Sequence, residues 1–169
     1  MLQFSVGSPI VHPIHGAGVM RAIERKEIRG KLLNYYVIDF PYSDLGQVMV
    51  PVEMAEKVGL RAISGNNNIE VIFDALSESF TEAEEEESKS FHQRYREYLE
   101  RIQSGDLSQV AKVYRLLYRR SLNKPLGTKD KSLFETARQL LVSEIVYSKS
   151  VADQDAKVLL DEAMEEVVF

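Results

Sequence analysis

The residues best suited to chemistry in this sequence are the arginines and lysines of residues 89–139. This segment carries 12 Lys and Arg against 5 Asp and Glu, a net charge of +7, although the whole chain has a formal net charge of −5. Arginine suits phosphate because its guanidinium donates two parallel hydrogen bonds. Several such side chains give salt-dependent affinity for nucleic acid that depends little on base sequence. The alternative is a solvated helix face whose charges find partners elsewhere.

Helical spacing distributes these basic residues over the outer faces of successive helices. Arg94 falls on one flank of an apolar stripe that begins at Phe91, and Arg96 lies further round the same helix. On the next helix, Arg115 and Arg119 are i,i+4 neighbours and share a face. The basic residues that we predict to contact phosphate are Arg94, Arg96, Arg115, Arg119, Lys129, Lys131 and Arg138.

Phe91 has two interpretations. It shares a helical stripe with Tyr95 and Ile102, and this periodicity favours packing in the core. It is also the first apolar residue of that stripe, and an aromatic side chain at a helix start can project past the core and wedge against a DNA base step. The sequence is compatible with both interpretations, and periodicity alone favours the core.

The sequence gives little support for a catalytic or metal-binding site. The chain has no cysteine, which excludes disulfides and thiolate chemistry. His12 and His15 are spaced like a metal pair, but Pro13 between them disfavours a regular helix or a central strand. The turn at Gly16–Gly18 is too short for a phosphate-binding fingerprint and does not open a helix. We therefore expect no enzyme activity, no metal and no cofactor.

The first third of the chain predicts a small antiparallel β-barrel. Short strand-like runs lie within residues 4–13, 19–28, 32–40 and 47–52, at roughly ten-residue spacing with turn residues between them. Arg29-Gly30-Lys31 is typical of a hairpin turn, and the preceding run alternates so that Val19, Ala22 or Ile23, and Ile28 face inward. The fold class is therefore α+β, with the barrel placed before a helical part.

From Ile69 onward the apolar period changes from two to 3.6, which predicts a bundle of about five helices. We expect Asn68 to be the N-cap of the first, Thr81 and Glu84 to form a capping box, and Thr128 to cap a long later helix. The boundary is predicted near residues 64–68, which gives domains at 1–64 and 65–169. Residues 78–88 carry six Glu and no basic residue.

No segment has the pattern of a signal peptide or the ~20 consecutive apolar residues of a membrane helix. The expectation is a cytoplasmic, nucleoid-associated protein that does not bind membranes. A monomer is expected, and a domain-swapped dimer is the alternative.

Five stretches of the chain carry a family resemblance when they are taken together. They are VGSPIVHPIHGAGVMRAIERKEIRG, YYVIDF and VMVPVEMAEKVGLRAI in the first part, and FHQRYREYLERIQSGDLSQVAKVYRLLYRR and ARQLLVSEIVYS in the second. This combination resembles the CarD/CdnL family of bacterial transcription regulators. Its first part is similar to a module shared with transcription-repair coupling factors. The match covers nearly the whole chain apart from residues 78–88.

The resemblance implies a Tudor-like barrel that docks on the β subunit of RNA polymerase, and a helical domain on promoter DNA at the upstream edge of the transcription bubble. It implies that an edge strand of the barrel pairs with a polymerase strand, a form of β-augmentation. By position, the polymerase-binding residues are Lys26, Val48, Met49 and Val50. Phe91 takes the position of the family's wedge tryptophan.

The sequence departs from the family pattern at three positions. Met49 replaces a basic residue that is common at the edge strand, and Gln93 is neutral where a basic residue is usual. Phe91 replaces tryptophan, and the chain has no tryptophan at all. Phenylalanine can still wedge, but it lacks the indole N–H and some stacking area.

The leading hypothesis is a regulator that binds polymerase through the barrel and DNA through the helices, and so stabilises the open promoter complex. The alternative is an adapter that does not bind DNA and uses the barrel and the helices for two protein partners.

Overall fold

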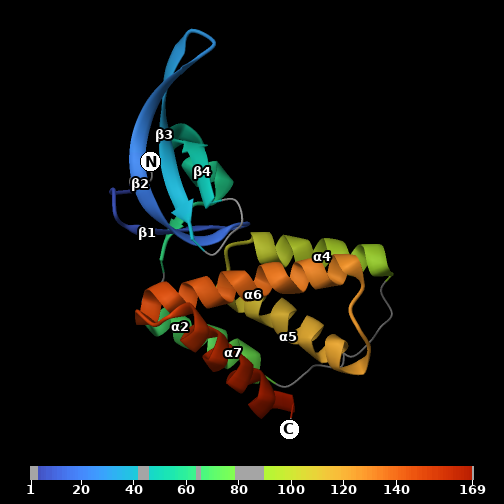
Figure 1. Ribbon diagram of the computed structural model, residues 1–169. Helices are drawn as coiled ribbons and strands as arrows, with labels where there is room; N and C mark the ends of the chain where they lie inside the picture. Colours follow the sequence, from blue (N-terminus) through green and yellow to red (C-terminus); the bar gives the residue numbers. More distant parts are fainter. Residues whose placement is uncertain (1–3, 42–45, 64–65, 79–89, 169) are drawn as a thin grey trace.

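The computed structural model describes residues 4–41, 46–63, 66–78 and 90–168 (Figure 1). The predicted capping box of Thr81 and Glu84 lies outside these residues. A five-stranded antiparallel sheet precedes the helices, so the predicted α+β class is confirmed. The strands are β1 (Pro9–His12), β2 (Gly16–Ile28), β3 (Lys31–Phe40), β4 (Gly46–Pro51) and β5 (Arg61–Ala62).

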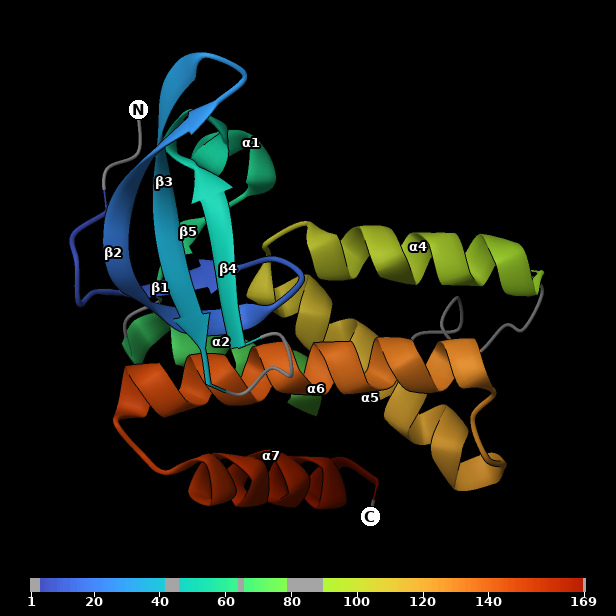
Figure 2. The same cartoon turned by 45° about the horizontal axis from the view of Figure 1, so that its top comes forward.

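The strand order is β4-β3-β2-β1-β5, so β4 and β5 are the two edges. A register shift between Met20 and Ala22 marks a β-bulge in β2, and such a bulge bends its strand. The long bent β2 wraps the sheet around its own core (Figure 2). Because no described strand pairs β4 with β5, the barrel remains open along these edges. The core residues are Ile10, Met20, Tyr36, Ile38, Phe40, Val50, Ala55 and Leu60.

The β2–β3 hairpin extends beyond this core (Figure 1). Arg29 and Gly30 both have positive φ, of 53° and 76°, which is the geometry of a two-residue hairpin turn. The predicted turn is therefore confirmed. The prediction that Ile28 faces inward is wrong: Ile28 is exposed because the hairpin tip has no core beneath it.

A short 3₁₀ helix η1 (Val52–Met54) and α1 (Ala55–Val58) lie between β4 and β5 in the chain. The five helices that follow are α2 (Asn66–Ser77), α4 (Phe91–Gln103), α5 (Leu107–Asn123), α6 (Thr128–Lys149) and α7 (Asp153–Val168). Within the described residues, this confirms the predicted bundle of about five helices. Two caps differ from prediction: α2 begins at Asn66, before Asn68, and Gly127 is the N-cap of α6 in place of Thr128.

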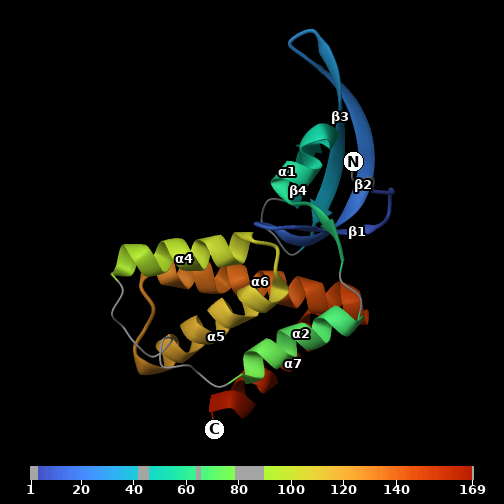
Figure 3. The ribbon, with the colours of Figure 1, turned by 180° about the vertical axis from the view of Figure 1, so that it is seen from behind.

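Apolar stripes with helical spacing form a second core. On α5, Val110, Val113, Tyr114 and Leu117 are buried, whereas Tyr118, whose helical spacing places it on the same face, is partly buried. Leu133 and Leu141 of α6 are also buried. Helices α4 and α6 run side by side in the same direction, so their N-termini lie at one end of the bundle (Figures 1 and 3).

The sheet rests on the C-terminal half of α6 (Figure 1). The fully buried carboxylate of Glu144 binds the Arg61 guanidinium through two hydrogen bonds of 3.2 Å. The Ser143 hydroxyl accepts a hydrogen bond of 2.9 Å from the Ala17 amide. Gly16 has φ of +83°, and a Cβ there would lie 2.9 Å from that hydroxyl oxygen, so glycine permits this close approach. These contacts fix the sheet relative to the far end of α6.

Candidate nucleic-acid interface

Phe91 is the first residue of α4, and its position is fixed by a capping box. The Ser90 hydroxyl accepts a hydrogen bond from the Gln93 amide, and the Gln93 side chain accepts one from the Ser90 amide. Gln93, which is neutral in place of a basic residue, therefore defines the helix start. The Phe91 side chain is 39% exposed, so the core interpretation favoured by periodicity is wrong.

The Phe91 ring is nevertheless supported on one side. It stacks on Tyr95 with ring centroids 6.1 Å apart, and the Arg94 guanidinium carbon lies 5.3 Å from the Phe91 centroid. The Lys129 ammonium lies 5.4 Å from the Tyr95 centroid, which places the start of α6 beside the start of α4. Tyr95 and Arg94 therefore cover part of the Phe91 ring, and the rest of its surface is available for contact.

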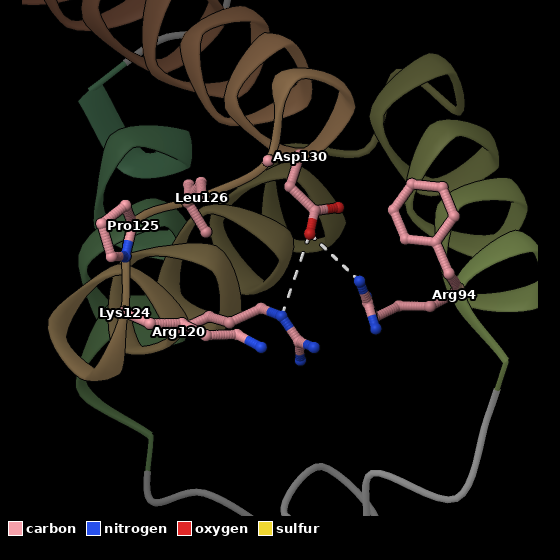
Figure 4. Close-up of a pocket in the computed structure, with 8 residues that line it drawn as sticks. Arg94, Arg120, Lys124, Pro125, Leu126 and Asp130 are labelled. Atoms are coloured by element: carbon pink, nitrogen blue, oxygen red, sulfur yellow. Dashed lines mark hydrogen bonds and ion pairs between the residues drawn. The ribbon is translucent and has the colours of Figure 1, made fainter.

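An acidic residue holds two of the arginines. Asp130, in the first turn of α6, is only 5% exposed. Its Oδ2 accepts a hydrogen bond of 3.0 Å from Arg94 Nη2 and lies 3.8 Å from Arg120 Nε (Figure 4). Arg94, predicted as a phosphate contact, is therefore largely buried and paired, and its first role is to join α4 to α6.

The remaining predicted phosphate contacts divide by exposure. Arg96, Lys129 and Lys131 are exposed, and all three belong to the N-terminal halves of α4 and α6. Arg119 is half-buried on α5. The structure therefore brings Arg96, Lys129 and Lys131 to the same two helices as Phe91. Lys124, which follows α5 and was not selected from the sequence, is also exposed near this end.

Arg115 is not exposed as Arg96, Lys129 and Lys131 are, and its prediction as a DNA contact is wrong. The residue is 1% exposed. Its Nη1 donates hydrogen bonds of 2.9 Å to the carbonyl oxygens of Ala75 and Glu78. Carbonyl groups at a helix C-terminus have no partner within the helix, so Arg115 satisfies the end of α2.

Arg138 is also occupied by other contacts. Its Nη2 lies 3.1 Å from Asp161 Oδ1 of α7, so the charge is balanced within the bundle. The neighbouring Tyr114 is buried, and burial raises the pKa of its hydroxyl to about 12, so the phenol is neutral at pH 7. Arg138 therefore contributes to packing between α5, α6 and α7.

The four predicted polymerase-binding residues lie on or beside the β4 edge. Alternation along β4 separates their side chains: Val50 is buried and Val48 packs against the sheet core, whereas Met49 faces outward. The Lys26 ammonium of β2 lies 3.4 Å from the Met49 sulfur on that outer face. A strand added at this edge would meet the β4 backbone and the Met49 and Lys26 side chains, but not Val50.

The histidines suspected as a metal pair lie close together, with ring centroids 4.4 Å apart. His12 Nδ1 accepts hydrogen bonds from the amides of Ile14 and His15, so this nitrogen is occupied by the turn. Burial, with a smaller contribution from His15, lowers the pKa of His12 to about 4. Within the described residues there is no group of three or more potential metal ligands.

Within the described residues, no helix combines the length and the apolar composition that crossing a membrane requires.

The structure combines an open-edged sheet with a helical bundle that carries exposed Arg96, Lys129 and Lys131 on α4 and α6. A family model of the CarD-like/TRCF RID domain matches residues 4–64, and one of the CarD C-terminal domain matches residues 75–161. The chain belongs to the CarD family of transcription regulators. It is similar to the candidate transcription factor YdeB of Bacillus subtilis (strain 168), with 29% identity over 155 residues, 92% of this chain and 98% of that protein.

Proposed function

We propose that the protein docks on the β subunit of RNA polymerase through the β4 edge. We further propose that it contacts promoter DNA at the upstream edge of the transcription bubble through the starts of α4 and α6. The observation that carries the proposal is the position of Phe91, an exposed aromatic ring at the start of α4, one of the two helices that carry the exposed Arg96, Lys129 and Lys131. Phe91 would occupy the fork between paired and melted DNA, while the cations neutralise phosphates.

The polymerase contact supports this weak DNA surface by tethering. Within the described residues no strand pairs with the outer side of β4, and the match of residues 4–64 to the CarD-like/TRCF RID domain supports a polymerase strand as its partner. Once the sheet is docked, the bundle is held near the DNA at a high effective concentration. The ion pair between Arg61 and Glu144 joins the sheet to α6. The net effect is a longer-lived open complex, with little dependence on promoter sequence.

A binding experiment on a promoter fork tests this function. Fluorescence anisotropy measures the affinity of the protein for a forked promoter duplex, with and without polymerase, across a series of salt concentrations. We expect binding that polymerase strengthens and salt weakens steeply, because phosphate contacts release counterions. Binding to polymerase with no salt-dependent contribution from the fork would favour the adapter alternative and refute the DNA contact.

A further inference from the structure

A pocket of about 320 Å³ opens beside Phe91, between the first turn of α4, the end of α5 and the loop that leads into α6 (Figure 4). Its size is at the lower end of the range for small-molecule sites. Phe91, Arg94, Arg120, Lys124, Leu126 and Asp130 are among its lining residues. It therefore combines an aromatic ring, three cations and one carboxylate.

The buried carboxylate of Asp130 is incompletely satisfied. Oδ2 receives Arg94 and lies near Arg120, whereas Oδ1 has no hydrogen-bond partner among the described residues. A buried acceptor without a donor is costly, so this oxygen favours a ligand that brings an N–H group, which reaches it once the Asp130 side chain turns toward the pocket. In Figure 4 the dashed lines from both arginines reach the same oxygen of Asp130, and the other oxygen has none.

The charge of the pocket favours an anion. Arg94, Arg120 and Lys124 together exceed Asp130 by two positive charges. Gly127, the N-cap of α6, provides no side-chain hydrogen bond to the first-turn amides, and the N-terminus of a 22-residue helix is itself favourable for phosphate. A free cation is disfavoured by the three basic groups. Inorganic phosphate has a P–OH donor but no ring that could contact Phe91.

A nucleotide supplies an N–H donor for Asp130 Oδ1, a negative charge for the basic side chains and a ring that can contact Phe91. We propose that this pocket binds one unpaired nucleotide, with an N–H group of the base donating to Asp130 Oδ1. The phosphate would lie near Arg120 and Lys124, and the base would contact the exposed Phe91 ring. Each base carries at least one N–H donor, so the pocket selects a nucleotide and not a sequence. The inference deepens the proposed function and rests on it: the nucleotide is one released from the melted promoter strand. A free nucleotide carries the same base and phosphate groups and would fit the pocket in the same way.

A single substitution can block this pocket without removing any side chain that would contact the nucleotide. Gly127 has φ of −65°, which any residue adopts, and a Cβ at Gly127 meets no atom within 4 Å. Gly127→Glu places a bulky anion at the pocket wall. Ser132→Glu is the matched control, because it makes the same change of charge at an exposed position of α6 that does not line the pocket. The unfolding midpoints of both variants establish that they fold.

The experiment has two arms. In the first, calorimetry measures binding of the four deoxynucleoside monophosphates and of inorganic phosphate to the wild type and both variants. In the second, fork duplexes carry an abasic residue at each unpaired position in turn. We expect at least one position at which loss of the base weakens binding about tenfold in the wild type and in Ser132→Glu, the scale of one base-stacking contact. Gly127→Glu should bind the normal and the abasic fork alike.

The outcomes separate the pocket from the wider function. Base-dependent fork binding that Gly127→Glu removes supports a nucleotide of the promoter strand. Mononucleotide binding that Gly127→Glu removes supports the pocket with a free nucleotide. The pocket is refuted if no mononucleotide binds better than inorganic phosphate and the two variants bind every fork equally. A wild type that binds no fork at all refutes the proposed function instead, and the mononucleotide arm still tests the pocket.

Discussion

Arg94 Nη2 lies 3.0 Å from Asp130 Oδ2, and this largely buried ion pair joins the first turn of α4 to the first turn of α6. The two residues are 36 positions apart in the chain. Their contact holds the start of α4 beside the start of α6, where Lys129 lies over the Tyr95 ring on which Phe91 stacks. The carboxylate of Asp130, although negative, therefore helps to position the exposed basic residues at the starts of α4 and α6.

Removing one partner of this pair should destabilise the bundle strongly, and removing both should cost less than the two single losses added together. Removing one partner of a buried pair leaves an uncompensated charge, so we expect Arg94→Met and Asp130→Leu each to cost about 3 kcal/mol of unfolding free energy. The double variant should lose less than the sum of the two. Urea unfolding of the four proteins completes the cycle. Simple additivity would show that the pair does not couple the two helices.

Arg115 should affect stability and not DNA binding. Arg115→Met leaves the carbonyl groups of Ala75 and Glu78 without their donor, and we expect a loss of about 2 kcal/mol in unfolding free energy. Fork affinity of the folded variant should stay unchanged. Lys131→Gln, at an exposed position, should show the reverse pattern, with native stability and a smaller salt slope. Weakened fork binding by a folded Arg115→Met protein would contradict the assignment.

The β4 edge should be sensitive to charge at Met49. Met49→Glu places a carboxylate on the outward side of the edge strand, and we expect polymerase affinity to fall at least tenfold because a docked strand would have to desolvate it. Val6→Glu is the control, since Val6 is also exposed and apolar but precedes β1, a strand that β2 and β3 separate from β4 in the sheet. Surface plasmon resonance with immobilised polymerase measures both. Equal affinities for the two variants would remove β4 from the docking surface.

Mild acid should destabilise the sheet through His12. Its pKa is lowered to about 4 in the folded protein against about 6.5 in the unfolded chain, so folding favours the neutral ring. The stabilising contribution is complete above pH 6.5 and is lost as the pH falls toward 4. Between pH 7.5 and 5.0 the loss should be about 2 kcal/mol. In urea titrations at these two pH values, His12→Asn should lose most of this dependence; an unchanged dependence would identify another group.

The sequence predicted the elements well where local chemistry determines them. Positive φ at Arg29 and Gly30 makes the β2–β3 turn, and the stripes of α5 and α6 identify the buried faces. The exposure of Ile28 could not be foreseen, because alternation shows which residues share a face but not how far the core extends beneath it. The domain limits at 1–64 and 65–169 and the oligomeric state stay predictions.

The candidate site was predicted less completely, for a related reason. Helical spacing places Arg115 relative to its own helix, but it does not show that the end of α2 lies against that position. Asp130 was overlooked, although a single acid in the basic run 124–131 was a signal that it binds a distant arginine. To predict the exposure of Phe91, one must know where α4 begins. The capping box at Ser90 makes Phe91 the first residue of the helix, and periodicity alone does not show this.

The lifetime of the open promoter complex tests the central claim most directly. It is measured after adding a competitor, with polymerase and saturating protein, for the wild type, Phe91→Ala, Phe91→Trp and the control Val158→Ala at an exposed apolar position of α7. Loss of the wedge should shorten the lifetime about tenfold, Phe91→Trp should lengthen it, and the control should match the wild type. Equal lifetimes for the wild type and Phe91→Ala on several promoters would contradict the wedge at the upstream fork.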